Sequence, residues 1–146
     1  MSELVGLDAV EILNVRNFPD KNGNLGFIEQ DKDVPFKISR IFYVYGVHSG
    51  DMRGQHAHKK CKQTLVCVHG SVTVVADDGK NKKTVVLDSP LKGLYIPPSI
   101  WAEQKYSSSD TMLMALTDQP FDEKDYIRDY EEFLEYRRAG AGESEG

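Results

Sequence analysis

The chain has 146 residues, 40% hydrophobic and 28% charged, which suits one globular domain rather than a disordered segment. Its net charge of −5 argues against nucleic acid as a partner, because binding phosphates needs a basic surface. There is no apolar run near the roughly 20 residues of a membrane span and no signal-peptide pattern in MSELVGLDAVEILNV, so we expect a cytoplasmic protein that does not bind membranes.

Short runs of β-branched and aromatic residues alternate with turn residues along most of the chain, and this pattern predicts strands. The turns are expected at residues 18–23 and 77–81, which are rich in Asn, Asp and Gly. The strands are expected at residues 10–15, 26–29, 38–47, 64–68, 71–76, 83–87, 93–96 and 111–117. Strands at this spacing, with little helix, predict an all-β sandwich or barrel.

The two ends of the chain are expected to differ from the body. Residues 1–37 look extended and not self-sufficient, so they could form an arm that adds to a partner's sheet, and a homodimer with exchanged strands is a hypothesis. Tyr126, Tyr130, Phe133 and Leu134 fall at helical spacing and predict a short amphipathic helix on the sheet. Residues 1–138 are thus read as a single domain, and residues 139–146 as a flexible acidic tail.

The segment from Gly50 to Gly70 has the spacing of a known metal-binding strand pair. It reads G-x5-H-x-H-x4-Q-x6-G, which resembles the cupin signature with Gln63 in place of the usual acid. The resemblance implies a double-stranded β-helix, or jelly roll. A later histidine ligand is also replaced, by Ala102. Since a neutral amide is a poor ligand and a methyl group is none, we expect no metal and no other cofactor.

His56 and His58 are two residues apart and would project from the same face of a strand. An unperturbed histidine titrates near pH 6.5, so two imidazoles in a pocket can act as base and acid at neutral pH. We therefore take His56 and His58 as the candidate catalytic pair. Cys61 and Cys67 are too few for a disulfide framework and are expected to be reduced thiols.

Several other side chains are candidates for binding a substrate. Arg53, close before the histidines, offers a planar fork for phosphate, and Arg40 opens an apolar strand in which a cation needs an anionic partner. Tyr43 and Tyr45 share a strand face and offer rings for stacking, although core packing is the alternative for each. The substrate-binding candidates are Arg40, Tyr43, Tyr45, Arg53, Gln63 and Trp101.

Taken together, these motifs resemble the TDP-4-keto-6-deoxyglucose 3,4-ketoisomerases, the WxcM-like cupin sugar isomerases. The resemblance covers residues 10–136 and rests on RGQHAHK at 53–59, the turn at 77–79 and DYIRDY at 125–130. It implies a metal-free jelly-roll dimer with exchanged N-terminal strands and a nucleotide-sugar ligand. It also implies catalysis by His56 and His58, with Arg40, Tyr43 and Arg53 lining the ligand site. The chain departs from the family's pattern at Ala102 and at Asn22-Gly23.

The implied reaction converts dTDP-4-keto-6-deoxy-D-glucose into a dTDP-3-keto-6-deoxyhexose through an enediol, by histidine acid–base catalysis. Such a product would serve the synthesis of deoxyamino sugars for O-antigen or S-layer glycans. Two alternatives stay open. One is a dTDP-sugar 3,5-epimerase-like cupin, which also needs a histidine base. The other is a non-catalytic cupin that binds a sugar nucleotide without turnover.

Overall fold

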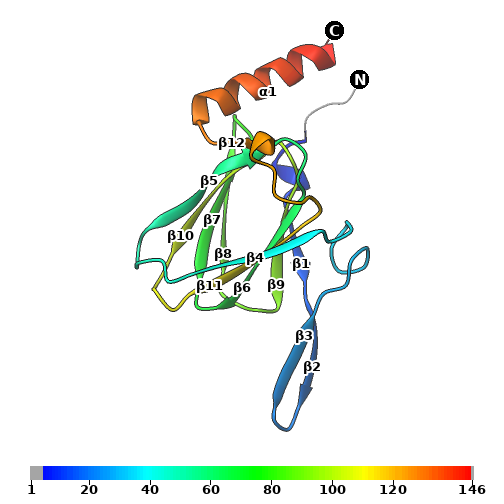
Figure 1. The fold of residues 1–146 in the computed structure, drawn as a ribbon, viewed down its shortest axis with the longest axis vertical. Coiled ribbons are helices and arrows are strands. Elements are labelled where there is room, and N and C mark those ends of the chain that lie inside the picture. Colours follow the sequence, from blue (N-terminus) through cyan, green and yellow to red (C-terminus); the bar gives the residue numbers. More distant parts are fainter. Residues whose placement is uncertain (1–4, 146) are drawn as a thin grey trace.

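The computed structural model describes residues 5–145, and for residues 141–145 the backbone alone. Almost all of the elements are strands (Figure 1). They are β1 (Glu11–Asn14), β2 (Arg16–Asp20), β3 (Gly23–Phe27), β4 (Arg40–Tyr45), β5 (Met52–His58), β6 (Gln63–His69), β7 (Val72–Asp77), β8 (Lys82–Leu87), β9 (Lys92–Ile96), β10 (Trp101–Tyr106), β11 (Met112–Thr117) and β12 (Tyr126–Ile127). Two 3₁₀ turns, η1 (Leu7–Ala9) and η2 (Glu123–Asp125), and the helix α1 (Tyr130–Glu145) complete the chain.

Ten of the strands form two five-stranded antiparallel sheets. The first sheet has the order β1-β9-β6-β11-β4, and the second has the order β12-β5-β10-β7-β8. The inward side chains of both sheets form the main core, with Leu65, Val74, Leu94 and Leu113 almost fully buried. The alternation is clear in β10, where Ala102, Gln104 and Tyr106 face inward. The expected all-β jelly roll is confirmed.

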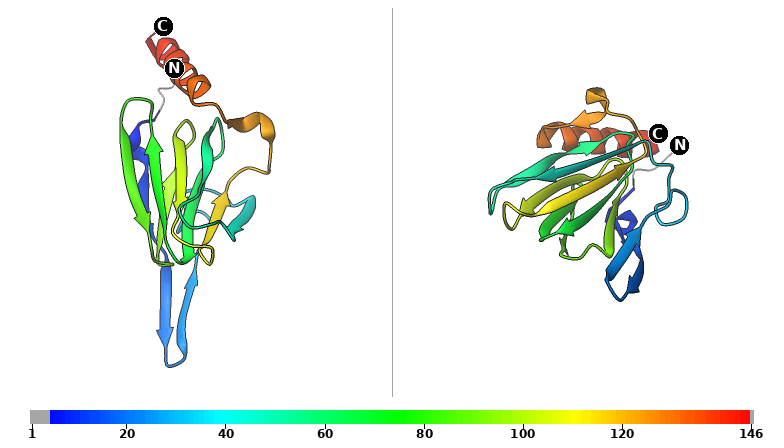
Figure 2. Two further views of the ribbon diagram at one scale, coloured as in Figure 1. Left: turned by 90° about the vertical axis from the view of Figure 1, so that its left-hand side faces the viewer. Right: turned by 60° about the horizontal axis from the view of Figure 1, so that its bottom comes forward.

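A second, smaller apolar cluster lies on the outer face of the second sheet. Ala57, Trp101 and Ile127 of the sheet pack there against Phe133 of helix α1. The helix therefore lies along one end of the second sheet, as two of the views show (Figures 1 and 2). This arrangement fixes the direction of the two histidines, because Ala57 points to the helix and its neighbours on β5 point the other way.

The N-terminal segment forms a hairpin that projects away from the body (Figure 2). Strands β2 and β3 pair only with each other, and the rings of Phe18 and Phe27 stack at 5.5 Å between centroids. The sequence predicts residues 18–20 in a turn, and this prediction is wrong, since they belong to β2. Pro19 is tolerated in the strand because both strands of a two-stranded ribbon are edge strands, where proline can be accommodated. Strand β1 pairs with β9 of the same chain. Exchange of strands between two copies stays a prediction.

The C-terminal helix differs from the expected one at both ends. It begins at Tyr130, after Asp129, whose carboxylate accepts a hydrogen bond from the Glu132 backbone N–H at 3.0 Å and so caps the first turn. Tyr126, which was expected in the helix, lies in β12. The helix continues to Glu145, so the expected flexible tail is helical as far as the structure describes it, and residue 146 lies outside the described residues.

No helix within residues 5–145 combines the length and the apolar character needed to cross a membrane.

Candidate active site

Strand β5 carries both histidines, and a bulge decides which way its earlier residues point. His56 is paired with Ala102 of β10, and Arg53 is paired with Gln104, with an irregularity in the register between them. Gly54 lies within this irregularity, with φ at +69°. Arg53 and His56 are an odd number of residues apart, yet they lie on the same face of the sheet, because paired residues in a sheet share a face. Arg53 is exposed there, near the start of the strand. The bulge thus brings Arg53 to the side of the histidines.

The imidazole rings of His56 and His58 meet edge to face, with centroids 4.9 Å apart. His58 is almost fully buried and its Nδ1 lies 2.9 Å from Oδ2 of Asp125. The Asp125 carboxylate also accepts hydrogen bonds from the backbone N–H groups of Lys60, at 2.6 Å, and Cys61, at 3.3 Å. These bonds fix the carboxylate, so His58 is held in one orientation with Nε2 left for other contacts.

Tyr126 closes one side of the histidine pair. Its ring centroid lies 4.4 Å from that of His58 and 5.0 Å from that of His56. The guanidinium of Arg128 lies 4.3 Å from the centroid of the same tyrosine ring, and Arg128 forms an ion pair with Glu123 at 2.8 Å. Strand β12 places these groups, because it pairs Tyr126 with His58 across the sheet.

Both histidines are neutral at physiological pH. Burial lowers the pKa of His56 from 6.5 to about 3, and the charges of His58, when it is protonated, and of Arg128 add to this shift. Burial also lowers the pKa of His58, but the hydrogen bond to Asp125 opposes that shift. Asp125 therefore makes His58 the imidazole better able to take up a proton, while His56 remains a neutral donor or acceptor.

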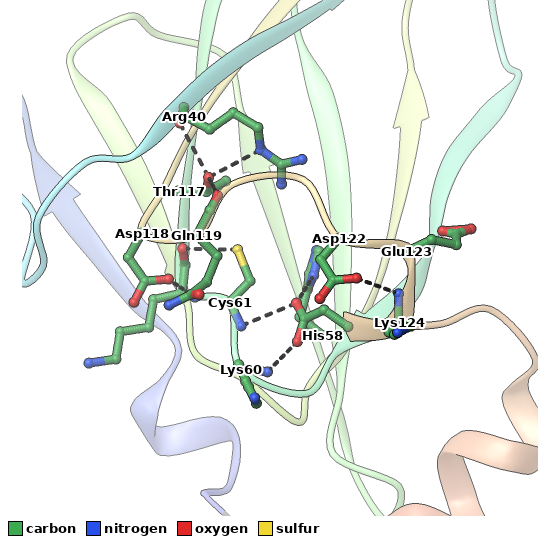
Figure 3. Close-up of polar contacts among 12 residues, drawn as sticks. Arg40, His58, Lys60, Cys61, Thr117, Asp118, Gln119, Asp122, Glu123 and Lys124 are labelled. Carbon is green, nitrogen blue, oxygen red and sulfur yellow. Dashed lines mark hydrogen bonds and ion pairs between the residues drawn. The ribbon is translucent and has the colours of Figure 1, made fainter.

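Arg40 reaches the same region from β4. Its Nε donates to Thr117 Oγ1 at 3.4 Å, and its charge is near enough to lower the pKa of His58. Figure 3 shows the Cys61 thiol between the Arg40–Thr117 contact and His58. Thus Arg40 of the first sheet lies near His58, whereas Arg53 of the second sheet shares the face of the histidines but is exposed.

Of the remaining predicted residues, only Gln63 shares the inner face. It is buried at the start of β6, on the side of Leu65. Tyr43 and Tyr45 share a face, as expected, but it is the outer face of the edge strand β4, where they are 60% and 65% exposed. The structure therefore places them neither in the core nor beside the histidines of their own chain.

Trp101 is also placed away from the imidazoles. It lies in the cluster beneath α1, where its ring packs against Phe133 and its Nε1 donates to Glu103 at 3.0 Å. Its neighbour Ala102 faces His56 instead. The side chain that the sequence suggested for the pocket thus anchors the helix, since successive residues of a strand point to opposite faces.

Three residues of the site were not identified as site residues from the sequence, namely Asp125, Tyr126 and Arg128. All three belong to the DYIRDY segment, which was noted only as part of a resemblance. A signal was present in Asp129-x-x-Glu132, a pattern of helix starts that would have moved the helix past Tyr126. The pairing of β12 with β5 could not be predicted from the sequence, because a strand of two residues has no recognisable pattern and its position depends on the fold.

The donors of the usual cupin metal site do not fit a metal here. Ala102, directly opposite His56 in the register, offers only a methyl group, and Gln63 offers a neutral amide. The two histidines remain, and Nδ1 of one of them is engaged by Asp125. We therefore derive no catalytic step through a metal.

Comparison with known proteins identifies the family of this chain. A family model described as WxcM-like, C-terminal matches residues 8–138. A TDP-4-oxo-6-deoxy-alpha-D-glucose-3,4-oxoisomerase from Aneurinibacillus thermoaerophilus is 42% identical over 126 residues, covering 86% of this chain and 91% of that protein.

Two solved structures share the fold closely. QdtA, a sugar 3,4-ketoisomerase from Thermoanaerobacterium thermosaccharolyticum in complex with TDP, is 35% identical with a TM-score of 0.86, over 89% of this chain and 95% of QdtA. WlaRB, a TDP-quinovose 3,4-ketoisomerase from Campylobacter jejuni, is 39% identical with a TM-score of 0.82, over 86% of this chain and 97% of WlaRB. The chain therefore belongs to the WxcM-like family, and these relatives are sugar 3,4-ketoisomerases.

Proposed function

We propose that this protein is a sugar-nucleotide 3,4-ketoisomerase that acts on dTDP-4-keto-6-deoxy-D-glucose. The observation that carries the proposal is the pair of neutral imidazoles, His56 and His58, one of them held by Asp125, in a chain whose relatives perform this reaction. A proton transfer between neighbouring carbons needs a base of this kind and donors for the oxygen atoms.

The reaction moves atoms only within the sugar. A base removes the C3 proton, which the C4 carbonyl makes acidic, and the C4 oxygen takes up a proton to give an enediol. The proton is then delivered to C4 while the C3 hydroxyl loses its own, so that C3 becomes the carbonyl. No atom is gained or lost, and no oxidant is required.

The two histidines are assigned different roles in this proposal. His58 carries the proton between the carbons, because Asp125 stabilises the imidazolium that forms when Nε2 takes up the proton. His56, with its pKa lowered to about 3, is a poor base and serves as a neutral hydrogen-bond partner for the sugar oxygens. Tyr126, whose ring contacts both imidazoles, restricts their movement.

The arginines support an anionic ligand. The chain as a whole is acidic, yet Arg40 and Arg128 lie near the histidines, and Arg53 is exposed on the same face of the sheet. Guanidinium groups bind phosphate oxygens through paired hydrogen bonds, so this local positive charge suits a nucleoside diphosphate. In this proposal the arginines bind the diphosphate, and the buried amide of Gln63 supplies a polar group at the inner end of the ligand site.

The test is incubation with TDP-4-keto-6-deoxyglucose followed by NMR of the product. We expect the carbonyl to move from C4 to C3 and a new C–H bond to appear at C4. His58→Asn should abolish both changes, and His56→Asn should slow turnover by roughly 10²-fold or more, while both variants still bind TDP. His69→Asn, in an exposed position of β6, is the matched control and should turn over normally.

Other outcomes of this experiment would contradict the proposal. Inversion at C3 or C5 with the carbonyl still at C4 would identify an epimerase. Binding of the sugar nucleotide without any chemical change would identify a non-catalytic protein. Normal turnover by both histidine variants would remove them from the mechanism.

We also propose that the protein works as a homodimer in the cytoplasm and supplies a deoxyamino-sugar route such as that of O-antigen or S-layer glycans. The support for a dimer is the exposed row of Ile41, Tyr43 and Tyr45 on β4, together with the projecting hairpin β2–β3. Rows of exposed aromatic and aliphatic side chains mark interaction surfaces.

A further inference from the structure

The thiol of Cys61 lies against the catalytic dyad and has no part in the reaction described above. Ligand atoms of His58, Cys61 and Asp125 all lie within 4.8 Å of one another. Among the described side chains this is the one group of three or more His, Cys, Asp or Glu residues close enough to hold a metal ion. All three residues are at least nine-tenths buried.

The donor types and spacing suit Zn²⁺. Zinc prefers tetrahedral sets of imidazole nitrogen, thiolate sulfur and carboxylate oxygen, at about 2.0–2.3 Å from the metal. Ligand atoms of such a site are about 3.4–3.6 Å apart. The His58 Nδ1 and Asp125 Oδ2 atoms, now 2.9 Å apart, would need to separate only slightly, and Cys61 would approach by a rotation of its side chain.

The metal costs one weak hydrogen bond to the backbone, the 3.5 Å contact in which the Cys61 thiol donates to the Lys62 carbonyl. It would replace the proton between His58 Nδ1 and Asp125, and the imidazole stays neutral by carrying its proton on Nε2 after exchange with solvent. The carboxylate keeps its bonds from the Lys60 and Cys61 backbone N–H groups. A carboxylate has about four acceptor positions, so one remains for the metal.

The charges also balance. A thiolate and a carboxylate together neutralise a divalent cation, which limits the cost of burying it near the positive charge of Arg40. Burial raises the pKa of the Cys61 thiol, so the thiol is protonated in the free protein and must lose its proton to the solvent when a metal binds.

We propose that His58, Cys61 and Asp125 form an inhibitory Zn²⁺ site, in which the metal takes the dyad out of action. The three residues leave one tetrahedral position for a water molecule. Inhibition rests on the proposed function, because it requires that His58 act in turnover; the metal binding itself does not. A Zn²⁺-bound His58 has lost its hydrogen bond to Asp125 and cannot accept the substrate proton in its normal orientation.

The binding test uses Co²⁺ as a spectroscopic substitute for Zn²⁺ on the full chain. We expect the visible bands of tetrahedral cobalt and the ultraviolet sulfur-to-cobalt band in the wild type, with displacement by Zn²⁺ and loss on adding EDTA. Cys61→Ser should lose the sulfur band and bind Zn²⁺ at least tenfold more weakly. Cys67→Ser is the matched control, since Cys67 is equally buried but lies at the far end of β6.

The activity test measures turnover against Zn²⁺ concentration for the same proteins, each relative to its own rate without zinc. The wild type and Cys67→Ser should be inhibited and recover with EDTA, and Cys61→Ser should need at least tenfold more zinc. Absence of cobalt bands in the wild type would overturn the site. Equal zinc sensitivity of Cys61→Ser would also overturn it, since the metal would then bind elsewhere. If cobalt binds as expected but the protein has no isomerase activity, the proposed function fails and the metal site stands.

Discussion

At the scale of single residues, Asp125 distinguishes two histidines that are otherwise alike. His58 is buried and His56 is partly buried, and the loss of solvent lowers the pKa of both. Only His58 has a carboxylate at 2.9 Å, and that carboxylate is itself held by backbone N–H groups. The same aspartate thus acts as a positioning group and as the partner of the developing imidazolium.

We predict that Asp125→Asn lowers kcat by roughly 10²- to 10⁴-fold and leaves TDP binding unchanged. Turnover needs neutral His58, so activity falls as the pH drops through the pKa of His58. Burial already lowers that pKa below the ordinary histidine value of about 6.5. The acidic limb of the pH profile, where activity falls, is therefore expected below that pH. Since Asp125 raises the pKa of His58, its removal should move the limb to still lower pH.

The measurement is a pH profile of kcat and kcat/KM for the wild type and the variant. Asp122→Asn is the control, because Asp122 only accepts a hydrogen bond from the Lys124 backbone N–H in an exposed turn. A fall in rate with no movement of the acidic limb would argue for a purely structural role of Asp125.

At the scale of secondary structure elements, the bulge in β5 determines which side chains share the pocket. Gly54 lies in the left-handed region, and a Cβ atom at this position would lie only 2.7 Å from the amide nitrogen of Gln104. Gln104 in turn accepts a hydrogen bond from the Tyr106 hydroxyl at 3.0 Å. The glycine thus allows the strand to turn Arg53 to the face of the histidines without disturbing this buried pair.

We predict that Gly54→Ala lowers the free energy of unfolding by about 2–4 kcal/mol, through a strained φ and displacement of Gln104. The matched control is Gly50→Ala. Gly50 also has a positive φ, at +84°, but a Cβ atom added there would have no neighbouring atom within 4 Å. Denaturant unfolding of both variants separates the two causes. Equal losses would show that backbone strain accounts for the whole effect.

At the scale of the whole molecule, the exposed aromatic row on β4 points to contact with a second copy. Tyr43 and Tyr45 lie with Ile41 on the outer face of the first sheet, at its edge. The other sheet has its outer face covered in part by helix α1. The second sheet is thus partly covered by its own chain, whereas the first sheet presents this exposed aromatic row.

We predict that the wild type is a dimer at micromolar concentration and that Tyr43→Glu combined with Tyr45→Glu makes it a monomer. Two carboxylates buried in an apolar interface would lack partners and so oppose association. Light scattering coupled to gel filtration measures the mass. Val86→Glu, on an exposed position of β8 in the second sheet, is the control and should stay dimeric. A wild-type monomer would contradict the prediction.

The sequence by itself determined an all-β sandwich or barrel, most of its strands and the two histidines as candidate catalytic residues, and the resemblance to cupins implied the jelly roll. These features depend on local patterns: alternation of apolar residues, turn residues, and the fixed spacing from Gly50 to Gly70. The replacement of two cupin metal ligands by Gln63 and Ala102 could also be read from the sequence, because it depends only on which residues stand at those two positions of the signature.

Only the tertiary structure decided which side chains join the histidines. Asp125 is 67 residues from His58 along the chain, and β12 brings them together. The bulge at Gly54 turned Arg53 to the face of the histidines, while strict alternation placed Trp101 beneath the helix and Tyr43 on the outer face. Contacts between distant segments depend on strand pairing and packing, and a single residue of register changes the face to which a side chain points.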